Sequence, residues 1–419
     1  MKTIEILKNT VQDYAWGSLT AIPELLGQPA TGRPQAELWM GAHPKAPSQT
    51  YHDGKWASLL QVIEAHPADV LGEKTAQRYG RKLPYLFKVL AAVKPLSIQA
   101  HPNSQQAKEG FERENRLGLS LTASNRNYKD DNHKPECICA LTRFWGMNGF
   151  RGISEITRYL SCLCKDVLED EIALLKSRPN SQGLKHLFQS LLTMPPEKKT
   201  AAISSALSHA GSYNVPRDFP ADDPVFHWIQ RLYAEYPLDL GVLFPALFNL
   251  FCLEPGQALY LASGEPHAYL EGVAIELMAN SDNVLRGGLT QKHLDVPELL
   301  NILTFQEQVP SVILPRKCSA VEWVYDTPAA EFSLSVISVF PKIFWISPGK
   351  RSAEILLCTQ GQIVLDSGTD DDPIHLFKGV SVVIPASIAK YHLYGSGVCY
   401  KASVPGPAGF MLDTRSAES

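Results

Sequence analysis

The segment GQALYLASGEPHAYLEG, residues 256–272, carries the pattern on which the fold prediction depends. It reads as a strand, a turn and a second strand. Residues 379–395, GVSVVIPASIAKYHLYG, align with it without a gap, and glycine brackets both copies. The repeat predicts two related β-barrels, unless two amphipathic hairpins share the pattern by chance. In this register Lys390 matches His267, and a protonated lysine is a poor metal ligand, so one barrel is expected to carry a metal and its copy is not.

Strand patterns also occur on both sides of these hairpins. Residues 83–90 and 96–101 read as strands bounded by prolines, and from Glu331 onward nearly every segment alternates or is rich in Val, Ile and Phe. Such closely spaced short strands predict a β-sandwich or jelly roll. From Ile153 to about Tyr236 the apolar residues recur with the period of a helix, which predicts a helical insertion.

Length, charge and composition restrict the classes of protein that the chain can belong to. At 419 residues it is too long for one ordinary domain, so two or three are expected. A formal net charge of -4 gives no general attraction to nucleic acid or to an anionic membrane. The longest apolar stretch, 240–253, is too short to span a bilayer, and a secretory signal is missing from the N-terminus. We therefore expect a cytoplasmic protein with a small-molecule ligand, in which the eight cysteines are free thiols.

A first cluster of polar residues lies in the segment SIQAH. Side chains alternate along a strand, so Ser97, Gln99 and His101 share one face. If that face looks into a barrel, an unpaired amide and imidazole would each cost a few kcal/mol, and a shared cation is a reasonable partner. On its own, a Gln-x-His pair more often faces solvent.

Two further clusters follow. Lys134 and Glu136 share a face at the entry to an apolar strand, where the carboxylate can simply pair with the lysine. In the third cluster alternation aligns His267 with Tyr269. Charged and amide side chains are then threaded among strand-forming residues, which fits one solvated sheet face or a site better than a core: Glu276, Asn280, Asp282, Asn283, Arg286 and Lys292.

These clusters belong to an ordered series of motifs. The series is YAWGS (14–18), AELWMGAHP (36–44), LFKVL (86–90), SIQAHPN (97–103), NHKPE (132–136), PHAY (266–269) and SDNVLR (281–286). Taken together, the motifs resemble those of the type I mannose-6-phosphate isomerase (phosphomannose isomerase) family of the cupin superfamily. The resemblance covers essentially the whole chain.

The resemblance implies a mainly β fold with a helical insertion, made of two cupin-like jelly-roll barrels and an α-helical domain. We expect residues 1–150 and 237–305 to form a discontinuous catalytic cupin domain, 151–236 a helical insertion domain, and 306–419 a C-terminal cupin-like β-barrel without metal. The tail from Pro405 to Ser419, rich in small and polar residues, is expected to be poorly ordered or a surface strap.

The resemblance also implies a zinc-dependent aldose-ketose isomerase, which interconverts D-mannose 6-phosphate and D-fructose 6-phosphate through an enediol(ate). One Zn²⁺ per chain is expected on Gln99, His101, Glu136 and His267. The family's substrate-binding positions correspond here to Lys88, Ser97, Tyr269, Asp282 and Lys292, and the catalytic positions to Arg286, Glu276 and Lys134. Arg286 is the position usually assigned as catalytic. Glu276 is the candidate base, or the group that orients one, and Lys134 could assist ring opening or steady an oxyanion.

The chemistry of these residues agrees with that expectation but leaves two points open. Two imidazoles, one carboxylate and an open position suit catalytic zinc, although manganese or cobalt could substitute. The chain has no P-loop motif, so a phosphate must meet side-chain cations, of which Arg286 and Lys292 are the nearest supply. The sequence does not decide whether Arg286 serves the phosphate or the enediolate.

Small departures from the family pattern occur beside these cations. Gln291 stands where the family commonly has proline, and Gly287–Gly288 replaces a more usual Ala-Gly. Both changes are expected to loosen the loop that presents Lys292.

Two other classes of function stay open. Cupins also host metal-dependent epimerases and oxygenases, and a non-catalytic sugar-phosphate-binding protein could keep the same fold. Only two histidines fall at ligand positions, which argues against redox iron, and a pure binder has little need for Lys134, Glu276 and Arg286 around an open cation. Under the preferred interpretation the enzyme serves carbohydrate metabolism and GDP-mannose biosynthesis. It is expected to be a monomer without nucleic-acid or membrane partners.

Overall fold

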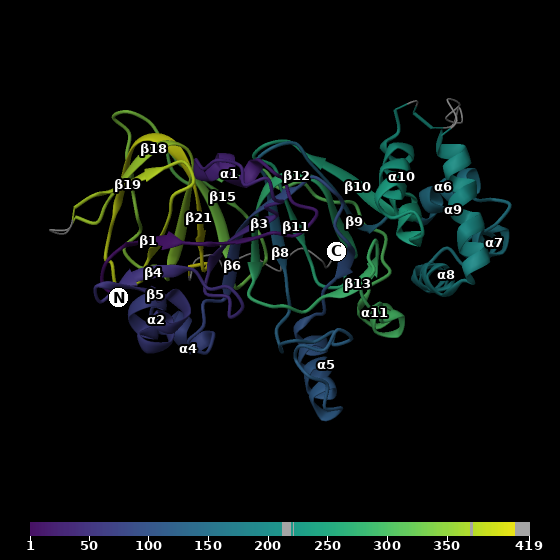
Figure 1. Cartoon of the computed structure of the whole chain (residues 1–419), viewed down its shortest axis with the longest axis horizontal. Helices are drawn as coiled ribbons and strands as arrows, with labels where there is room; N and C mark the ends of the chain where they lie inside the picture. Colours follow the sequence, from purple (N-terminus) through teal and green to yellow (C-terminus); the bar gives the residue numbers. More distant parts are fainter. Residues whose placement is uncertain (212–218, 221, 369–371, 407–419) are drawn as a thin grey trace, which may run out of the picture.

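The structure is a computed structural model, and it describes residues 1–211, 219–220, 222–368 and 372–406. Within these residues the strands form two large antiparallel sheets, of eleven and ten strands. Figure 1 shows an elongated molecule in which one sheet lies at the left end, the other in the middle, and helices α6 to α10 at the right end. The prediction for the tail concerns mostly residues 407–419, which lie outside the described part.

The ten-stranded sheet holds the strands that the polar motifs precede or occupy. Its main path runs β10-β9-β12-β6-β3-β2, and β7, β8, β11 and β13 attach beside it. The strands are β2 (Thr10–Gln12), β3 (Glu37–Gly41), β6 (Tyr85–Ala92), β7 (Ile98–Ala100), β8 (Glu136–Ala140), β9 (Phe144–Phe150), β10 (Phe248–Leu253), β11 (Ala258–Leu261), β12 (His267–Ala279) and β13 (Leu285–Gly288).

Strand β12 connects the parts of this sheet. Its first half pairs with β7 and β9, and its second half pairs with β6 and β8. The change of partners occurs around Gly272, which has φ +128, a conformation that L side chains rarely adopt. The bend at Gly272 therefore lets one strand present side chains from both halves to the same interior.

The eleven-stranded sheet joins both ends of the chain. Its main path runs β14-β15-β16-β21-β18-β20-β1-β4-β5, with β17 on β21 and β19 on β18. The N-terminal strand β1 thus pairs with β20, near the C-terminus. The strands are β1 (Glu5–Lys8), β4 (Gln49–His52), β5 (Lys55–Ser58), β14 (Arg316–Lys317), β15 (Glu322–Tyr325), β16 (Ser333–Val339), β17 (Trp345–Ile346), β18 (Glu354–Asp366), β19 (Ile374–Phe377), β20 (Ser381–Ile384) and β21 (His392–Ser403).

The helices lie mainly outside the two sheets. Those that follow the helical pattern in the sequence are α6 (Ile153–Leu163), α7 (Glu169–Ser177), α8 (Ser181–Thr193), α9 (Pro196–Gly211) and α10 (Pro224–Glu235). The others are α1 (Ala21–Leu26), α2 (Leu59–Ala65), α3 (Pro67–Leu71), α4 (Glu73–Arg78), α5 (Ser104–Arg116), the 3₁₀ helix η1 (Leu240–Ala246) and α11 (Val296–Ile302). Among the described helices, none is long and apolar enough to cross a membrane.

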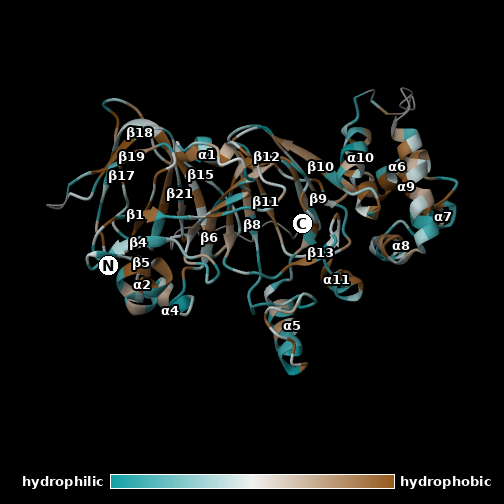
Figure 2. Cartoon of the chain, in the orientation of Figure 1, coloured by the Kyte–Doolittle hydropathy of each residue, from teal (hydrophilic) through white to brown (hydrophobic). Residues whose placement is uncertain are grey.

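Side chains cap the starts of α5 and α10. Asn103 and Gln106 form a capping box at the start of α5, and Asp223 caps α10 just before Pro224. Helix α5 is mostly teal in Figure 2, in keeping with a helix that buries only a narrow face. Because α5 begins three residues after His101, its cap fixes the chain where it leaves β7.

Two hydrophobic clusters pack against the ten-stranded sheet, which we call the site sheet. One joins β9 and β10 to the helices through aromatic contacts of Phe150 with Phe188 and Phe248, whose ring centroids lie 5.4 and 5.1 Å away. The other lies between the two sheets, where the buried Tyr85 donates hydrogen bonds to the carbonyls of Ala353 and Ala402. The site sheet thus packs against the helices through one cluster and against the C-terminal strands through the other.

Candidate metal centre and cavity

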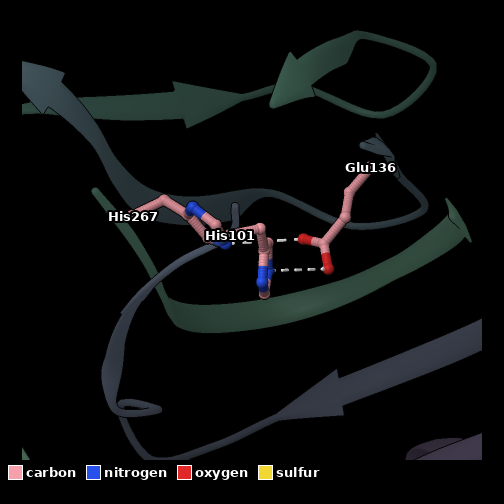
Figure 3. Close-up of side chains that lie close together, drawn as sticks. All are labelled: His101, Glu136 and His267. Carbon is pink, nitrogen blue, oxygen red and sulfur yellow. Dashed lines mark ion pairs between the residues drawn. The ribbon is translucent and has the colours of Figure 1, made fainter. Parts of the chain in front are cut away.

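Three side chains that are far apart in the sequence meet inside the ten-stranded sheet. His101 follows β7, Glu136 begins β8 and His267 begins β12. The Nε2 atoms of His101 and His267 lie 3.2 and 3.5 Å from the two carboxylate oxygens of Glu136. Figure 3 shows both imidazoles turned toward that carboxylate. One potential ligand atom from each residue lies within 4.8 Å of the others, and all three residues are buried.

The remaining ring nitrogens define which atom of each histidine is free to bind a cation. The Nδ1 atoms of His101 and His267 lie 2.8 and 3.0 Å from the carbonyl oxygens of Asn283 and Glu265. A carbonyl only accepts, so each Nδ1 carries the proton and each Nε2 presents its lone pair. Both Nε2 atoms are buried without a hydrogen-bond partner. A divalent ion between the Nε2 atoms and Glu136 would satisfy both of these nitrogens.

Electrostatics hold His101 and Glu136 in the protonation states that a metal requires. Burial, with Lys134 nearby, lowers the pKa of His101 to about 4, which keeps the imidazole neutral. Burial alone would raise the pKa of Glu136, but Lys134 and His101 hold it well below its usual range. The Nζ of Lys134 lies 3.1 Å from Glu136. The residues present therefore fit a divalent cation.

Gln99 is placed beside this centre by strand pairing. It lies opposite His267 on β12 and opposite Arg286 on β13. Directly opposed residues of antiparallel strands share a face, so Gln99, His267 and Arg286 form a row across three strands. Gln99 also lines the cavity above the centre.

A cavity of about 650 Å³ opens above the metal centre. His101 and His267 lie behind its wall, whereas the other residues predicted for the site line it: Lys88, Ser97, Gln99, Lys134, Glu136, Tyr269, Glu276, Asp282, Arg286 and Lys292. The wall also contains residues to which the sequence analysis assigned no role: Tyr14, Trp16, Glu37, Trp39, His43, Lys45 and Tyr236. Most of these lie in the YAWGS and AELWMGAHP motifs, which signalled the family but not a role for each side chain.

One wall of the cavity is a buried network of charges. Lys88 on β6 pairs in register with Glu276 on β12, and its Nζ lies 2.9 Å from that carboxylate and 4.0 Å from Glu37. The Tyr269 hydroxyl donates to Glu276 at 2.9 Å and to Glu136 at 3.2 Å. Tyr269 therefore links this network to the metal centre.

Burial and the network together raise the pKa of Glu276. Burial raises its pKa, Lys88 opposes that rise, and Glu136 adds to it. Burial would lower the pKa of Lys88, but Glu276 and Glu37 raise it, so the ammonium stays charged. A buried carboxylate with a raised pKa beside a metal centre is suited to proton transfer.

One side of the cavity is positively charged. Burial lowers the pKa of Arg286, and burial together with Arg286 and Lys45 lowers the pKa of Lys292. Within the described part of the chain, neither Arg286 nor Lys292 has an ion-pair partner. Asp282 is already engaged, since it lies 2.9 Å from the Nζ of Lys45 and 3.6 Å from His43. This side is therefore suited to a doubly charged anion.

Comparisons with known proteins agree with this geometry. Residues 4–153 match the family model for the catalytic domain of type I phosphomannose isomerase. The chain is 41% identical to the mannose-6-phosphate isomerase of Escherichia coli over 394 residues, which covers 93% of this chain and 97% of that protein. It is 34% identical to the human enzyme of the same name over 403 residues, covering 91% and 93%.

Solved structures show the same similarity in three dimensions. The crystal structure of mannose 6-phosphate isomerase from Salmonella typhimurium with fructose 6-phosphate and zinc superposes with a TM-score of 0.86 at 40% identity, covering 96% of this chain and 100% of that chain. A zinc-bound mannose 6-phosphate isomerase has the same TM-score, identity and coverage.

Proposed function

The chain belongs to the type I phosphomannose isomerase family, and from this premise we propose that it interconverts mannose 6-phosphate and fructose 6-phosphate in the cavity above His101, Glu136 and His267. One observation carries the proposal. Two buried Nε2 atoms without partners face a carboxylate at the bottom of a cavity, and unpaired cations line one side of that cavity. A sugar phosphate has the two features that such a cavity would recognise, a carbonyl or hydroxyl end and a dianionic end.

We propose that one zinc ion is held by His101, Glu136 and His267, with the Gln99 side-chain oxygen as the fourth protein ligand. A zinc ion held by these residues would supply Lewis-acid chemistry toward oxygens of the substrate. The backbone carbonyls of Asn283 and Glu265 orient the two imidazoles for this binding.

Glu276 is the proposed base for moving the proton between the two carbons of the reacting sugar. Its raised pKa makes it a stronger base than an ordinary carboxylate, and Lys88 holds its carboxylate in place. Tyr269 fixes the other oxygen. Lys134, which contacts Glu136, is proposed to assist opening of the sugar ring or to steady the oxyanion.

The cations divide between the two ends of the substrate. Arg286 on β13 pairs in register with Gln99 on β7. We therefore place its guanidinium at the enediolate, in the catalytic role. Lys292 is assigned to the phosphate. Ser97 and Asp282 also line the cavity and are proposed to bind sugar hydroxyls.

The finer architecture is also a proposal. Each antiparallel sheet is taken as a cupin-like jelly-roll barrel, with residues 1–150, apart from β1, β4 and β5, and 237–305 in the catalytic barrel, 151–236 as the helical domain and 306–419 as the C-terminal barrel. Strands β1, β4 and β5 are counted with the C-terminal barrel, because they pair with β20 and with one another. The protein is proposed to work as a cytoplasmic monomer without nucleic-acid or membrane partners, in keeping with its net charge.

A direct assay tests the function. Purified protein incubated with mannose 6-phosphate should form fructose 6-phosphate, lose this activity on treatment with a chelator, and regain it when zinc is returned. Binding of the sugar phosphate without conversion would favour the non-catalytic alternative. Turnover that survives complete removal of the metal would refute the zinc-dependent mechanism.

A further inference from the structure

Asp239 lies outside the cavity wall, at the point where the chain passes from α10 to η1. Its two carboxylate oxygens accept hydrogen bonds from two different segments. Oδ1 accepts from the backbone N–H of Gly241 at 2.8 Å, which caps η1, and Oδ2 accepts from the backbone N–H of Thr290 at 3.1 Å. The Asp239 side chain thus connects the start of η1 to the segment 286–292, which contains Arg286 and Lys292.

The contact continues from Thr290 to Lys292. The Thr290 hydroxyl accepts a hydrogen bond from the backbone N–H of Lys292 at 3.1 Å. Asp239 therefore fixes Thr290, and Thr290 fixes the backbone of Lys292, which lines the cavity.

Gly288 and Leu289 pack closely against the start of η1. A Cβ on Gly288 would lie 3.2 Å from the Oδ1 of Asp239 and 3.4 Å from the Cα of Gly241. A Cβ on Gly241 would lie 2.9 Å from the side chain of Leu289. The Gly-Gly pair that was expected to loosen the loop instead includes Gly288, at φ +150, at the point of close approach.

The cations need such a restraint because they repel one another. Arg286 and Lys45 both act on the ammonium of Lys292 with like charge, and no described carboxylate pairs with Lys292 or Arg286. Without substrate, a free loop would spread these charges apart. The backbone bond to Asp239 holds Lys292 in place before the phosphate arrives.

We propose that Asp239 is a positioning residue for phosphate recognition, which acts through Thr290 and Lys292 without touching the substrate. This inference rests on the proposed function, because it takes the cationic side of the cavity as the phosphate subsite. The carboxylate lies four residues after the end of α10 and caps η1.

The substitution Asp239→Asn separates the two contacts. Asparagine keeps an oxygen for the Gly241 N–H and is itself a good helix cap, but its amide group cannot accept from Thr290. The expected result is a rise of about 5- to 10-fold in KM for mannose 6-phosphate and in the dissociation constant of inorganic phosphate, as for the loss of one hydrogen bond. The kcat should stay within about twofold, with zinc content and Tm unchanged.

Asp223 supplies a matched control. Its Oδ1 accepts from the Val225 N–H at 2.9 Å and its Oδ2 accepts from the Tyr159 hydroxyl at 2.8 Å, so it has the same arrangement at the start of α10, but neither of its partners lines the cavity. Asp223→Asn should leave KM and phosphate affinity unchanged. Unchanged phosphate affinity in Asp239→Asn, or an equal loss in Asp223→Asn, would overturn the proposal. Phosphate binding is measured by calorimetry, so a wild-type protein that binds phosphate but forms no fructose 6-phosphate would refute the function and not the positioning.

Discussion

At the residue scale, the metal centre depends on which nitrogen of each imidazole is left free. Two backbone carbonyls hold the Nδ1 protons of His101 and His267, and burial removes water from both Nε2 atoms. The resemblance supplied the candidate ligands, but not this orientation, because the carbonyls of Asn283 and Glu265 reach the rings only after folding. The simpler interpretation of Glu136, a pair with Lys134, is also realised, since the carboxylate contacts both the lysine and the histidines.

Replacing His267 should release the metal. His267→Ala removes one of two buried Nε2 donors, and we expect zinc affinity to fall at least about 100-fold and turnover to cease. Zinc per chain, measured by elemental analysis after dialysis, checks this expectation. His133→Ala is the control for metal content, because His133 pairs with Glu331 at 3.0 Å and lies outside the metal group. Full retention of zinc in His267→Ala would refute the ligand set.

The acidity of Glu276 gives a second prediction. Lys88 lowers the pKa of Glu276 against the effect of burial, so Lys88→Met should raise that pKa further. A base with a higher pKa is protonated, and inactive, up to a higher pH. The acid limb of kcat/KM should therefore move upward by about one pH unit. Lys45→Met, which removes the partner of Asp282 instead, should leave the limb in place; an unmoved limb in Lys88→Met would remove Glu276 as the base.

At the scale of elements, β12 carries the site. It presents His267 and Tyr269 from its first half and Glu276 from its second half, and it pairs with four other strands. The sequence predicted the strand around His267 and the polar face that follows. Its bend at Gly272 was not predicted, because alternation shows which residues share a face but not where a strand changes partners. The pairing of Lys88 with Glu276, which lie 188 residues apart, could not be predicted for the same reason.

Gly272 should tolerate no side chain. A Cβ there would lie 2.6 Å from the carbonyl oxygen of Arg143 and 2.8 Å from the Cα of Phe144, at φ +128. Strain and overlap together should cost about 2 kcal/mol or more in the Gly272→Ala variant. Gly256→Ala is the control, because Gly256 also has positive φ but open space around it, and about 1 kcal/mol is expected. Chemical denaturation measures both; equal losses would contradict the role of close packing at the bend.

At the scale of the whole molecule, the two sheets form one interdependent structure. The N-terminal strand β1 pairs with β20, and a hydrophobic cluster joins Phe87 and Ile275 of the ten-stranded sheet to Leu334 and Leu357 of the eleven-stranded sheet. The sequence predicted a mainly β chain with helices between residues 153 and 236. The sequence could not assign β1, β4 and β5 to the eleven-stranded sheet, because pairing between distant segments leaves no local signal in short alternating strands.

The stability of the zinc-free protein should depend on pH in a defined window. The pKa of His101 is about 4 in the folded chain and about 6.5 when exposed. Between these values the unfolded chain binds more protons, so the free energy of unfolding falls as the pH drops through this window, by up to about 3 kcal/mol. Urea denaturation with a chelator at pH 7 and pH 5 checks this sign. His101→Gln should flatten the dependence, and equal wild-type stability at both pH values would contradict a neutral buried His101.

One divalent ion is proposed to join segments from three distant parts of the chain. Anomalous X-ray scattering from crystals of the active protein at the zinc absorption edge tests it most directly. We predict a single peak about 2.0 to 2.2 Å from the Nε2 atoms of His101 and His267 and from an oxygen of Glu136, with the Gln99 oxygen completing the protein ligands. A peak elsewhere, or active crystals without a peak among these atoms, would contradict the account.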